Sequence, residues 1–169
     1  MEKWQSGDIN AFENLFRENE RIVFKDAYLI TGSREDAEDI LQEVFTSVWR
    51  SRHTFDPEKG KLSTWLHRIT VNECLKKKRK EKQRPLPLDG IDLQPDKDSR
   101  EEAMQQLDRE HLIEILDTLD ARHRAVLVLR YFDDLSYQEI ALAVGVPLGT
   151  VKSRINHALK LLRVRLGNE

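Results

Sequence analysis

The sequence predicts an all-α protein of two small helical domains joined by a flexible, acidic linker. Its 169 residues include only seven Gly and five Pro, with 7% aromatic residues, and this composition argues against a many-stranded β-sandwich. Apolar residues recur at the three- and four-residue spacing of a helix in several stretches, and capping residues stand before them. Three of the five Pro and one Gly fall within residues 85–98 and separate the two helical parts.

The first domain is expected over residues 1–84 and should contain about four helices. One or two helices are predicted before Gly32 from apolar residues at helical spacing, which are Ile9, Phe12, Leu15, Phe16, Ile22, Val23, Ala27 and Ile30. Ser33 can cap the next helix, whose apolar stripe is Ala37, Ile40, Leu41, Val44, Phe45 and Val48. Residues 51–61 contain Pro57 and Gly60 and are expected to form a loop. Another helix is predicted from Ser63 or Thr64 into the basic run 76–80.

The linker is expected over residues 85–98 and the second domain over residues 99–169. Ser99 and Glu102 form a capping box that predicts a helix start. The helix that follows is expected to bury Met104, Leu107, Leu112, Ile115, Leu116 and Leu119. Asp120 can cap a second helix, which would bury Val126, Leu127 and Leu129.

Residues 136–166 have the pattern of a helix-turn-helix. Ser136 and Glu139 form a capping box, Gly145 suits the end of the short helix, and Pro147 suits the first turn of the last helix. At about 100° per residue, one face of that last helix is apolar and the other presents Lys152, Ser153, Asn156, His157, Lys160 and Arg163. In this motif the second helix enters the DNA major groove, where cations meet phosphates and Ser, Asn or His can bond to base edges. A solvated surface helix is the alternative, but residues 148–166 hold five bases and no acid.

The formal net charge of −2 conceals an alternation of charge along the chain. Residues 8–49 hold four bases and ten acids (−6), and residues 50–84 hold twelve bases and four acids (+8). Residues 85–121 hold three bases and eleven acids (−8), and residues 122–169 hold eight bases and four acids (+4). The near-neutral total therefore does not exclude a nucleic-acid ligand, because two basic zones alternate with two acidic ones.

The two charged zones of the first domain favour different partners. Cations in the basic zone are interleaved with Phe55 and Trp65, a combination that suits unpaired DNA, although a core position is the preferred interpretation for Trp65 taken alone. Five acids within residues 35–43 would repel DNA and favour a protein partner. Trp49, at the end of that acidic helix, fits the core and a contact surface equally well.

Several classes of function are disfavoured. The lone Cys74 allows no internal disulfide and, by itself, no zinc site. The five His and Cys74 show none of the spacings H-x-E, H-E-x-x-H or C-x-x-C, and no Ser has a G-x-S-x-G setting. We therefore expect no enzyme, no catalytic residue, no cofactor and no metal. The absence of a long apolar segment and of a signal-peptide core predicts a cytoplasmic protein without membrane insertion.

Three separated motifs resemble one known family in order and spacing. They are DAEDILQEVF at residues 36–45, STWLHRI at 63–69 followed by Asn72, and LSYQEIA at 135–141 with GTVKSR at 149–154. On these motifs the chain resembles the extracytoplasmic-function (ECF, group IV) sigma factors of bacterial RNA polymerase, in the sigma-70 superfamily. The resemblance implies a non-catalytic subunit for transcription initiation, often in a stress response, with region 2 in residues 1–84 and region 4 in residues 99–169.

The resemblance also implies three sets of site residues. The clamp set, for the β′ clamp coiled coil of core polymerase, is Asp36, Asp39, Ile40, Gln42, Glu43, Phe45 and Trp49. The −10 set, for the melted promoter element, is Arg52, Phe55, Lys61, Trp65, Arg68, Asn72, Lys76 and Arg79. The −35 set, for the upstream duplex element, is Thr150, Lys152, Ser153, Arg154, Asn156, His157 and Lys160.

Further partners follow from the same resemblance. It implies core RNA polymerase, including its β flap, promoter DNA, an anti-sigma factor, and a monomeric state when the protein is free. A stand-alone helix-turn-helix regulator is the alternative, and it would require a dimer interface and palindromic sites. Neither a heptad repeat nor a spare apolar face in the sequence favours that alternative.

Overall fold

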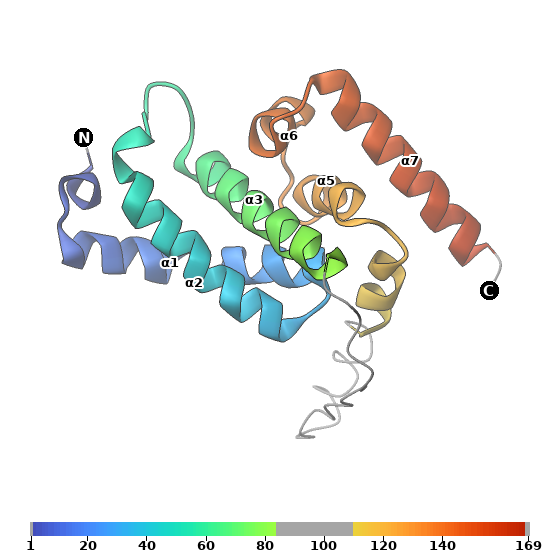
Figure 1. Ribbon diagram of the computed structural model, residues 1–169. Helices are drawn as coiled ribbons and strands as arrows, with labels where there is room; N and C mark the ends of the chain where they lie inside the picture. Colours follow the sequence, from blue (N-terminus) through green and yellow to red (C-terminus); the bar gives the residue numbers. More distant parts are fainter. Residues whose placement is uncertain (1, 84–109, 168–169) are drawn as a thin grey trace.

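Three long helices form the first half of the protein. The computed structural model describes residues 2–83 and 110–167. Helices α1 (Ile9–Thr31), α2 (Arg34–Ser51) and α3 (Leu62–Lys82) pack on one another as a three-helix bundle (Figure 1). A short 3₁₀ helix, η1 (Lys3–Ser6), precedes the bundle, and another, η2 (Arg52–Thr54), begins the loop after α2. The prediction of an all-α fold is confirmed over the described residues.

The helix boundaries of the first half follow the predicted caps. A single helix, α1, fills the stretch where one or two were expected, and it ends at Gly32, whose φ of 74° is left-handed. A Cβ at Gly32 would lie 2.7 Å from Asp117 Oδ1, so the Asp117 side chain would have to move, and the left-handed conformation itself favours glycine. The Ser33 hydroxyl accepts a hydrogen bond from the Asp36 N–H at 3.2 Å and starts α2. Helix α3 begins at Leu62, one residue before Ser63 and two before Thr64, the two predicted starts.

The second half contains the predicted helix-turn-helix. Residues 110–117 are helical, and α5 (Ala121–Tyr131), α6 (Tyr137–Val144) and α7 (Leu148–Leu166) follow. The Asp120 carboxylate accepts hydrogen bonds from the Arg122 and His123 N–H groups, both at 3.0 Å, and caps α5 as predicted. Leu116 and Leu119 are buried as expected. The linker, the Ser99 capping box, Met104 and Leu107 lie outside the described residues.

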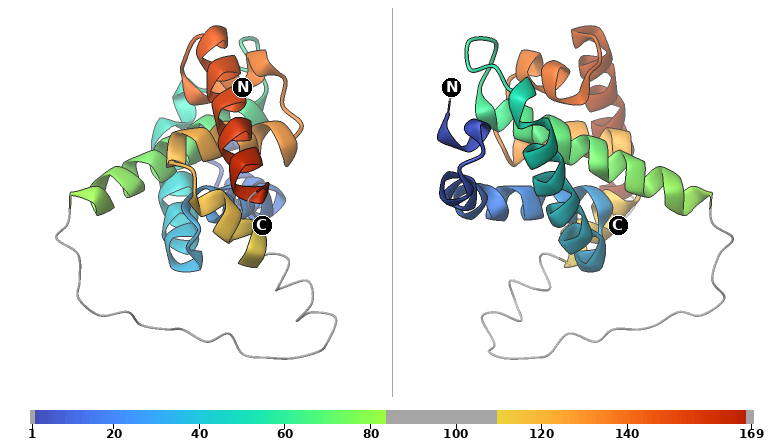
Figure 2. Two further views of the ribbon diagram at one scale, coloured as in Figure 1. Left: turned by 90° about the vertical axis from the view of Figure 1, so that its right-hand side faces the viewer. Right: turned by 60° about the vertical axis from the view of Figure 1, so that its left-hand side comes forward.

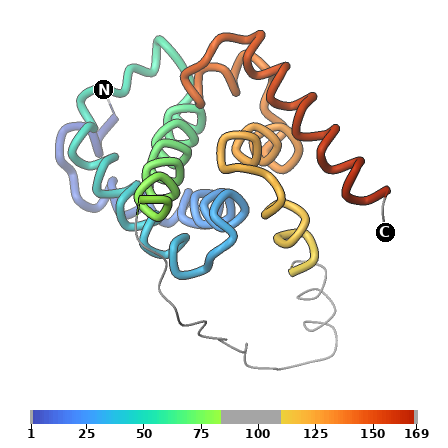
Figure 3. The backbone as a smooth tube through the Cα atoms, turned by 45° about the vertical axis from the view of Figure 1, so that its right-hand side comes forward, coloured from blue at the N-terminus to red at the C-terminus, as the bar shows by residue number. Residues whose placement is uncertain are grey.

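The two halves pack side by side. Helix α5 contacts α1 and α3, and α6 contacts α3, so α3 lies between the rest of the first half and the helix-turn-helix (Figures 1 and 3). Arg124 in α5 is 3% exposed, and its Nε donates a hydrogen bond to the Leu29 carbonyl of α1 at 3.0 Å. The same guanidinium pairs with Asp117. A buried cation with this bonding fixes α5 against the end of α1.

Two further observations concern the classes of function that the sequence disfavoured, namely thiol chemistry and membrane insertion. Cys74 is fully buried in α3, and burial raises the pKa of its thiol, which keeps it protonated and unreactive. Among the helices of residues 2–83 and 110–167, none combines the length and the apolar character required to cross a bilayer. Figure 2 shows these helices from two further sides.

Candidate functional site

The helix-turn-helix holds α7 by its apolar face. The Ser136 hydroxyl accepts a hydrogen bond from the Glu139 N–H at 3.2 Å, and Glu139 accepts one from the Ser136 N–H at 2.9 Å. Hydrogen bonds from Ser136 to the Glu139 carboxylate, together with the Lys61 ammonium, lower the pKa of Glu139 to about 2. Gly145 ends α6 with a φ of 68°. From α7, the buried residues Val151, Ile155 and Ala158 face α5 and α6. The opposite, charged face of α7 is consequently presented to solvent.

The structure brings the −35 set together on α7. Lys152, Ser153, Asn156, His157 and Lys160 are exposed, and Thr150 and Arg154 are partly buried. The Ser153 hydroxyl donates a hydrogen bond to the Thr150 carbonyl at 3.0 Å, so its O–H group is bonded within α7. The His157 ring lies 5.0 Å from the His123 ring of α5, at the edge of the face. Lys152, Asn156 and Lys160 are therefore the members best placed to reach a ligand.

Four members of the −10 set share one exposed face of α3. Arg68, Asn72, Lys76 and Arg79 follow one another at intervals of four, four and three residues, and all are exposed. Trp65, at the start of the same helix, is half-buried, and its ring centroid lies 5.4 Å from that of Phe55. Helix α3 thus offers cations and an amide for a nucleic-acid strand, while Trp65 also belongs to the packed core.

The remaining members of the −10 set stabilise the loop after α2. Phe55 is only 8% exposed and stacks on Trp4, with ring centroids 6.0 Å apart. The Arg52 guanidinium lies 4.4 Å from the centre of the Trp49 ring and donates to the Trp49 carbonyl at 2.7 Å. Lys61 is exposed, and its Nζ lies 3.0 Å from Glu139 Oε1 of α6. Phe55 therefore packs on Trp4 and Arg52 on Trp49, within the first half of the protein. Lys61 lies where the two halves meet.

Gln5 is a structural support of this loop that sequence reasoning did not find. Its side chain is 3% exposed, and its Nε2 donates to the Phe55 carbonyl at 2.8 Å and to the Arg52 carbonyl at 3.1 Å. An open depression of about 660 Å³ has Trp4, Phe55 and Lys61 in its lining. An isolated glutamine near the start of a sequence carries no pattern that would have indicated this role.

The clamp set divides into an exposed part and a buried part. Asp39, Gln42 and Glu43 are exposed on α2, and Asp36 is partly buried. Ile40 and Phe45 lie in the core, where Phe45 packs against Phe16 with ring centroids 4.7 Å apart. Trp49 is half-buried, with its ring 4.9 Å from that of Phe12. The acids and the amide can meet a partner, whereas the apolar members hold the helix in place.

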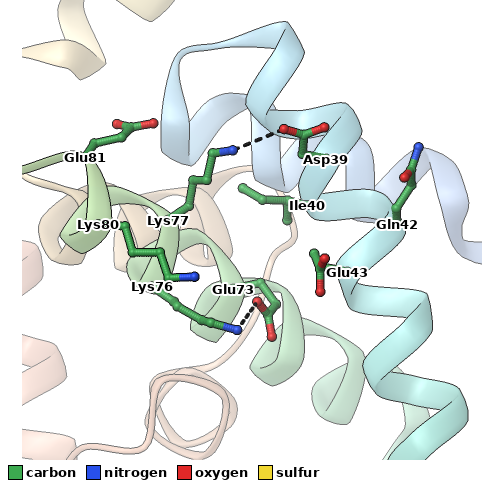
Figure 4. Close-up of a pocket in the computed structure, with 9 residues that line it drawn as sticks. All are labelled: Asp39, Ile40, Gln42, Glu43, Glu73, Lys76, Lys77, Lys80 and Glu81. Carbon is green, nitrogen blue, oxygen red and sulfur yellow. Dashed lines mark hydrogen bonds and ion pairs between the residues drawn. The ribbon is translucent and has the colours of Figure 1, made fainter. Parts of the chain in front are cut away.

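An open groove of about 420 Å³ separates the exposed part of the clamp set from the basic end of α3 (Figure 4). Lys77 Nζ lies 3.1 Å from Asp39 Oδ2 and 3.4 Å from Asp36 Oδ1, and bridges the two helices. Desolvation opposes the charge on Lys77, but its hydrogen bond to Asp39 and the charges of both acids raise its pKa above the ordinary value. Lys76 pairs with Glu73 on its own helix at 3.3 Å. The acids of α2 and the lysines of α3 therefore partly neutralise each other.

Two family models match the chain. The description of the first is Sigma-70 region 2, over residues 15–84, and that of the second is Sigma-70, region 4, over residues 115–164. The ECF RNA polymerase sigma factor SigE of Mycolicibacterium smegmatis is 36% identical over 158 residues, which cover 90% of this chain and 60% of SigE. The ECF RNA polymerase sigma factor RpoE of Cereibacter sphaeroides is 36% identical over 160 residues, which cover 92% of this chain and 86% of that protein.

Two solved structures share the arrangement of helices. CnrH, in complex with the cytosolic domain of CnrY, superposes with a TM-score of 0.72 at 25% identity, covering 98% of this chain and 93% of CnrH. The sigma factor RpoE of Bartonella quintana, in complex with the anti-sigma factor NepR, superposes with a TM-score of 0.74 at 22% identity, covering 94% of this chain and 98% of that one. Their likeness extends over both halves of the present structure.

Proposed function

The chain belongs to the ECF RNA polymerase sigma factors of the sigma-70 family, and from this we propose that it is a group IV factor that binds core polymerase and directs it to promoters. One observation carries the proposal for its DNA-binding role. The exposed face of α7 presents Lys152, Asn156 and Lys160 on a helix without a single acid, behind a complete helix-turn-helix. Such a helix suits the major groove of a −35 element.

The first half is proposed to hold the melted −10 element and the polymerase. The stripe of Arg68, Asn72, Lys76 and Arg79 on α3 supports a role in binding phosphates and extruded bases, which offsets the few kcal/mol lost on unpairing. Asp39, Gln42 and Glu43 on α2 support a role in binding a cationic surface of the β′ clamp. We propose boundaries of 1–84 for the first domain and 99–169 for the second.

The two DNA contacts are proposed to reinforce each other. Each domain alone would bind weakly, and their covalent connection raises the effective concentration of the second contact once the first has formed. The chemistry of RNA synthesis belongs to the polymerase, so the factor acts through binding free energy alone. The presence of both region 2 and region 4 favours this function over a stand-alone helix-turn-helix regulator, which needs no region 2.

An inhibitory protein partner is also proposed. CnrH, which is 25% identical to this chain, was solved in complex with the cytosolic domain of CnrY. CnrH and this chain share the arrangement of both halves. This supports an anti-sigma factor that would bind this chain while its two halves are packed against each other. We propose that the free protein is a cytoplasmic monomer.

The promoter-reading role can be tested by transcription in vitro and by DNA binding. Run-off transcription with core polymerase on a random promoter library should select a −35 and a −10 motif. On a selected −35 duplex, Asn156→Ala should cost about 1–3 kcal/mol and relax the base preference, while Lys160→Ala should weaken all sequences alike and reduce the salt slope by about one.

Arg165→Ala provides the matched control for these variants. Arg165 is exposed on the same helix but lies outside the −35 set, and its removal should have a smaller effect. The absence of any selected promoter motif would contradict the proposed function. If Asn156→Ala keeps the base preference of the wild type, only the proposed base-reading role of Asn156 is contradicted.

A further inference from the structure

Four titratable side chains meet where the two halves of the protein join, and we call them the junction cluster. Lys25 and Asp26 come from α1, His67 from α3, and Asp133 from the turn between α5 and α6. His67 Nδ1 lies 2.8 Å from Asp26 Oδ2, and Lys25 Nζ lies 3.5 Å from Asp26 Oδ1 and donates a hydrogen bond to Asp133 Oδ1. The side chains of Asp26 and Asp133 are each 2% exposed.

The junction cluster holds more acceptor capacity than its own donors satisfy. Asp26 Oδ1 and Asp133 Oδ2 are buried and accept no hydrogen bond within the described part of the protein. Two buried carboxylates, those of Asp26 and Asp133, face the single ammonium of Lys25. A buried carboxylate oxygen that accepts no hydrogen bond is costly, and Asp26 Oδ1 has only the ion pair with Lys25 at 3.5 Å, so the cluster favours additional positive charge.

We propose that Asp26, His67 and Asp133 form a site for a divalent transition-metal ion, above all Zn²⁺, that bridges the two halves of the protein. One donor atom from each residue lies within 4.8 Å of the donor atoms of the other two. One imidazole and two carboxylates are ligands that Zn²⁺ accepts, and a water molecule would complete a tetrahedron. Neighbouring ligands on such an ion lie about 3.3 Å apart, given bonds of about 2.0 Å, so small side-chain rotations suffice.

The Lys25 ammonium would compete with the ion for the two carboxylates. Its ammonium now neutralises part of the charge of the two carboxylates, but its side chain is 38% exposed and can turn into solvent. A dication would balance both carboxylates and take the place of the proton between His67 Nδ1 and Asp26 Oδ2. Metal and ammonium therefore exclude each other at this position.

The three proposed ligands come from both halves of the protein. Asp26 and His67 belong to the part that matches region 2, and Asp133 belongs to the part that matches region 4. An ion bound to all three would stabilise the packed arrangement of the halves relative to any separated one. The inference concerns metal binding alone and does not rest on the proposed function, so either can fail without the other.

The site can be tested on the full chain with Co²⁺ as an optical probe for Zn²⁺. At pH 7.5, titration should give one equivalent of ion with the visible absorption of a tetrahedral site, and Zn²⁺ should displace it. Asp133→Asn should weaken binding at least tenfold. Asp134→Asn is the matched control, because Asp134 is the next residue, is exposed, and has a left-handed φ of 54° that asparagine accepts well.

Lys25→Met gives a second test that does not disturb the ligands. Removal of the competing ammonium should tighten Co²⁺ binding several-fold, and Zn²⁺ should then raise the thermal midpoint of Lys25→Met and of the wild type but not that of Asp133→Asn. The proposal is overturned if the wild type binds no Co²⁺ in this form. It is also overturned if Asp133→Asn and Asp134→Asn bind equally well, because the ion would then lie elsewhere, or if Lys25→Met binds more weakly than the wild type.

Discussion

A covalent link between the two halves should abolish promoter-dependent transcription. The proposed function requires both promoter elements to be bound at once. The labels −35 and −10 place their centres about 25 base pairs apart, which is about 85 Å along a duplex at about 3.4 Å per base pair. A compact body of the size of the described residues, 2–83 and 110–167, has a radius of gyration of about 14 Å and a width of about 40 Å. The α3 and α7 faces of the packed molecule therefore cannot reach both elements, and the halves must separate by tens of ångströms.

The structure offers a suitable position for the link. Lys61 and Glu139 approach within 3.0 Å across the junction, so cysteines at the two positions can be joined by a bismaleimide whose spacer contains a disulfide, and a reductant then breaks the link. Cys74 is fully buried and should not react. Arg34 and Glu38, which pair at 3.2 Å within α2, provide a control link that leaves the halves free to separate.

Run-off transcription with core polymerase gives the readout. The Lys61→Cys/Glu139→Cys protein, once linked, should lose at least tenfold in promoter-dependent transcript and recover it after reduction. It should still bind an isolated −35 duplex, because the face of α7 remains exposed. Full transcription by the linked protein would refute the reasoning, since it would show that the packed arrangement can serve both elements.

Three other predictions concern the clamp set, the loop and acid stability. Asp39→Asn should weaken binding to core polymerase in a direct titration, with little change in the thermal midpoint because the Asp39 carboxylate that pairs with Lys77 is 57% exposed. Glu38→Gln should not weaken this binding, and equal effects would contradict the assignment. Gln5→Ala should lower the free energy of unfolding by about 1–3 kcal/mol, measured with urea, because the buried Phe55 carbonyl loses a donor. The pKa of Glu139 falls from 4.5 to about 2 on folding, so its stabilisation is present above pH 4.5 and lost as the pH falls to 2. Glu139→Gln should be less stable than the wild type at pH 6 but equally stable at pH 2.

The fold could be predicted where its cause is local. Ser33, Asp120 and Ser136 cap the helices that the sequence indicated, and Gly32 and Gly145 end theirs in the left-handed conformation. The packing of the two halves could not be predicted, because it depends on contacts between distant residues. The bond from Arg124 to the Leu29 carbonyl joins positions 95 residues apart, and neither residue shows its partner in the sequence.

The candidate sites divide in the same way. The face of α7 follows from helical phase alone, so its exposed members were predictable as a group. Whether Phe55 faces a ligand or the core depends on Trp4, which lies far away in the sequence, and the structure places it in the core. The junction cluster combines residues at positions 26, 67 and 133, a spacing that matches no metal-binding motif. A sequence motif records only ligands at short spacing, so it could not have indicated this cluster.

The two basic zones differ in how much of their charge is free to bind phosphate. Lys77 already pairs with Asp36 and Asp39, so a phosphate must replace two carboxylates before it gains this cation. Lys152 and Lys160 lie on a helix that carries no acid, and a phosphate displaces only water and counterions there. Lys77 should therefore contribute less to DNA affinity than Lys152 or Lys160. The net charge of −2 comes from the eleven acids and three bases of residues 85–121, so it does not prevent α7 from exposing a strongly basic face.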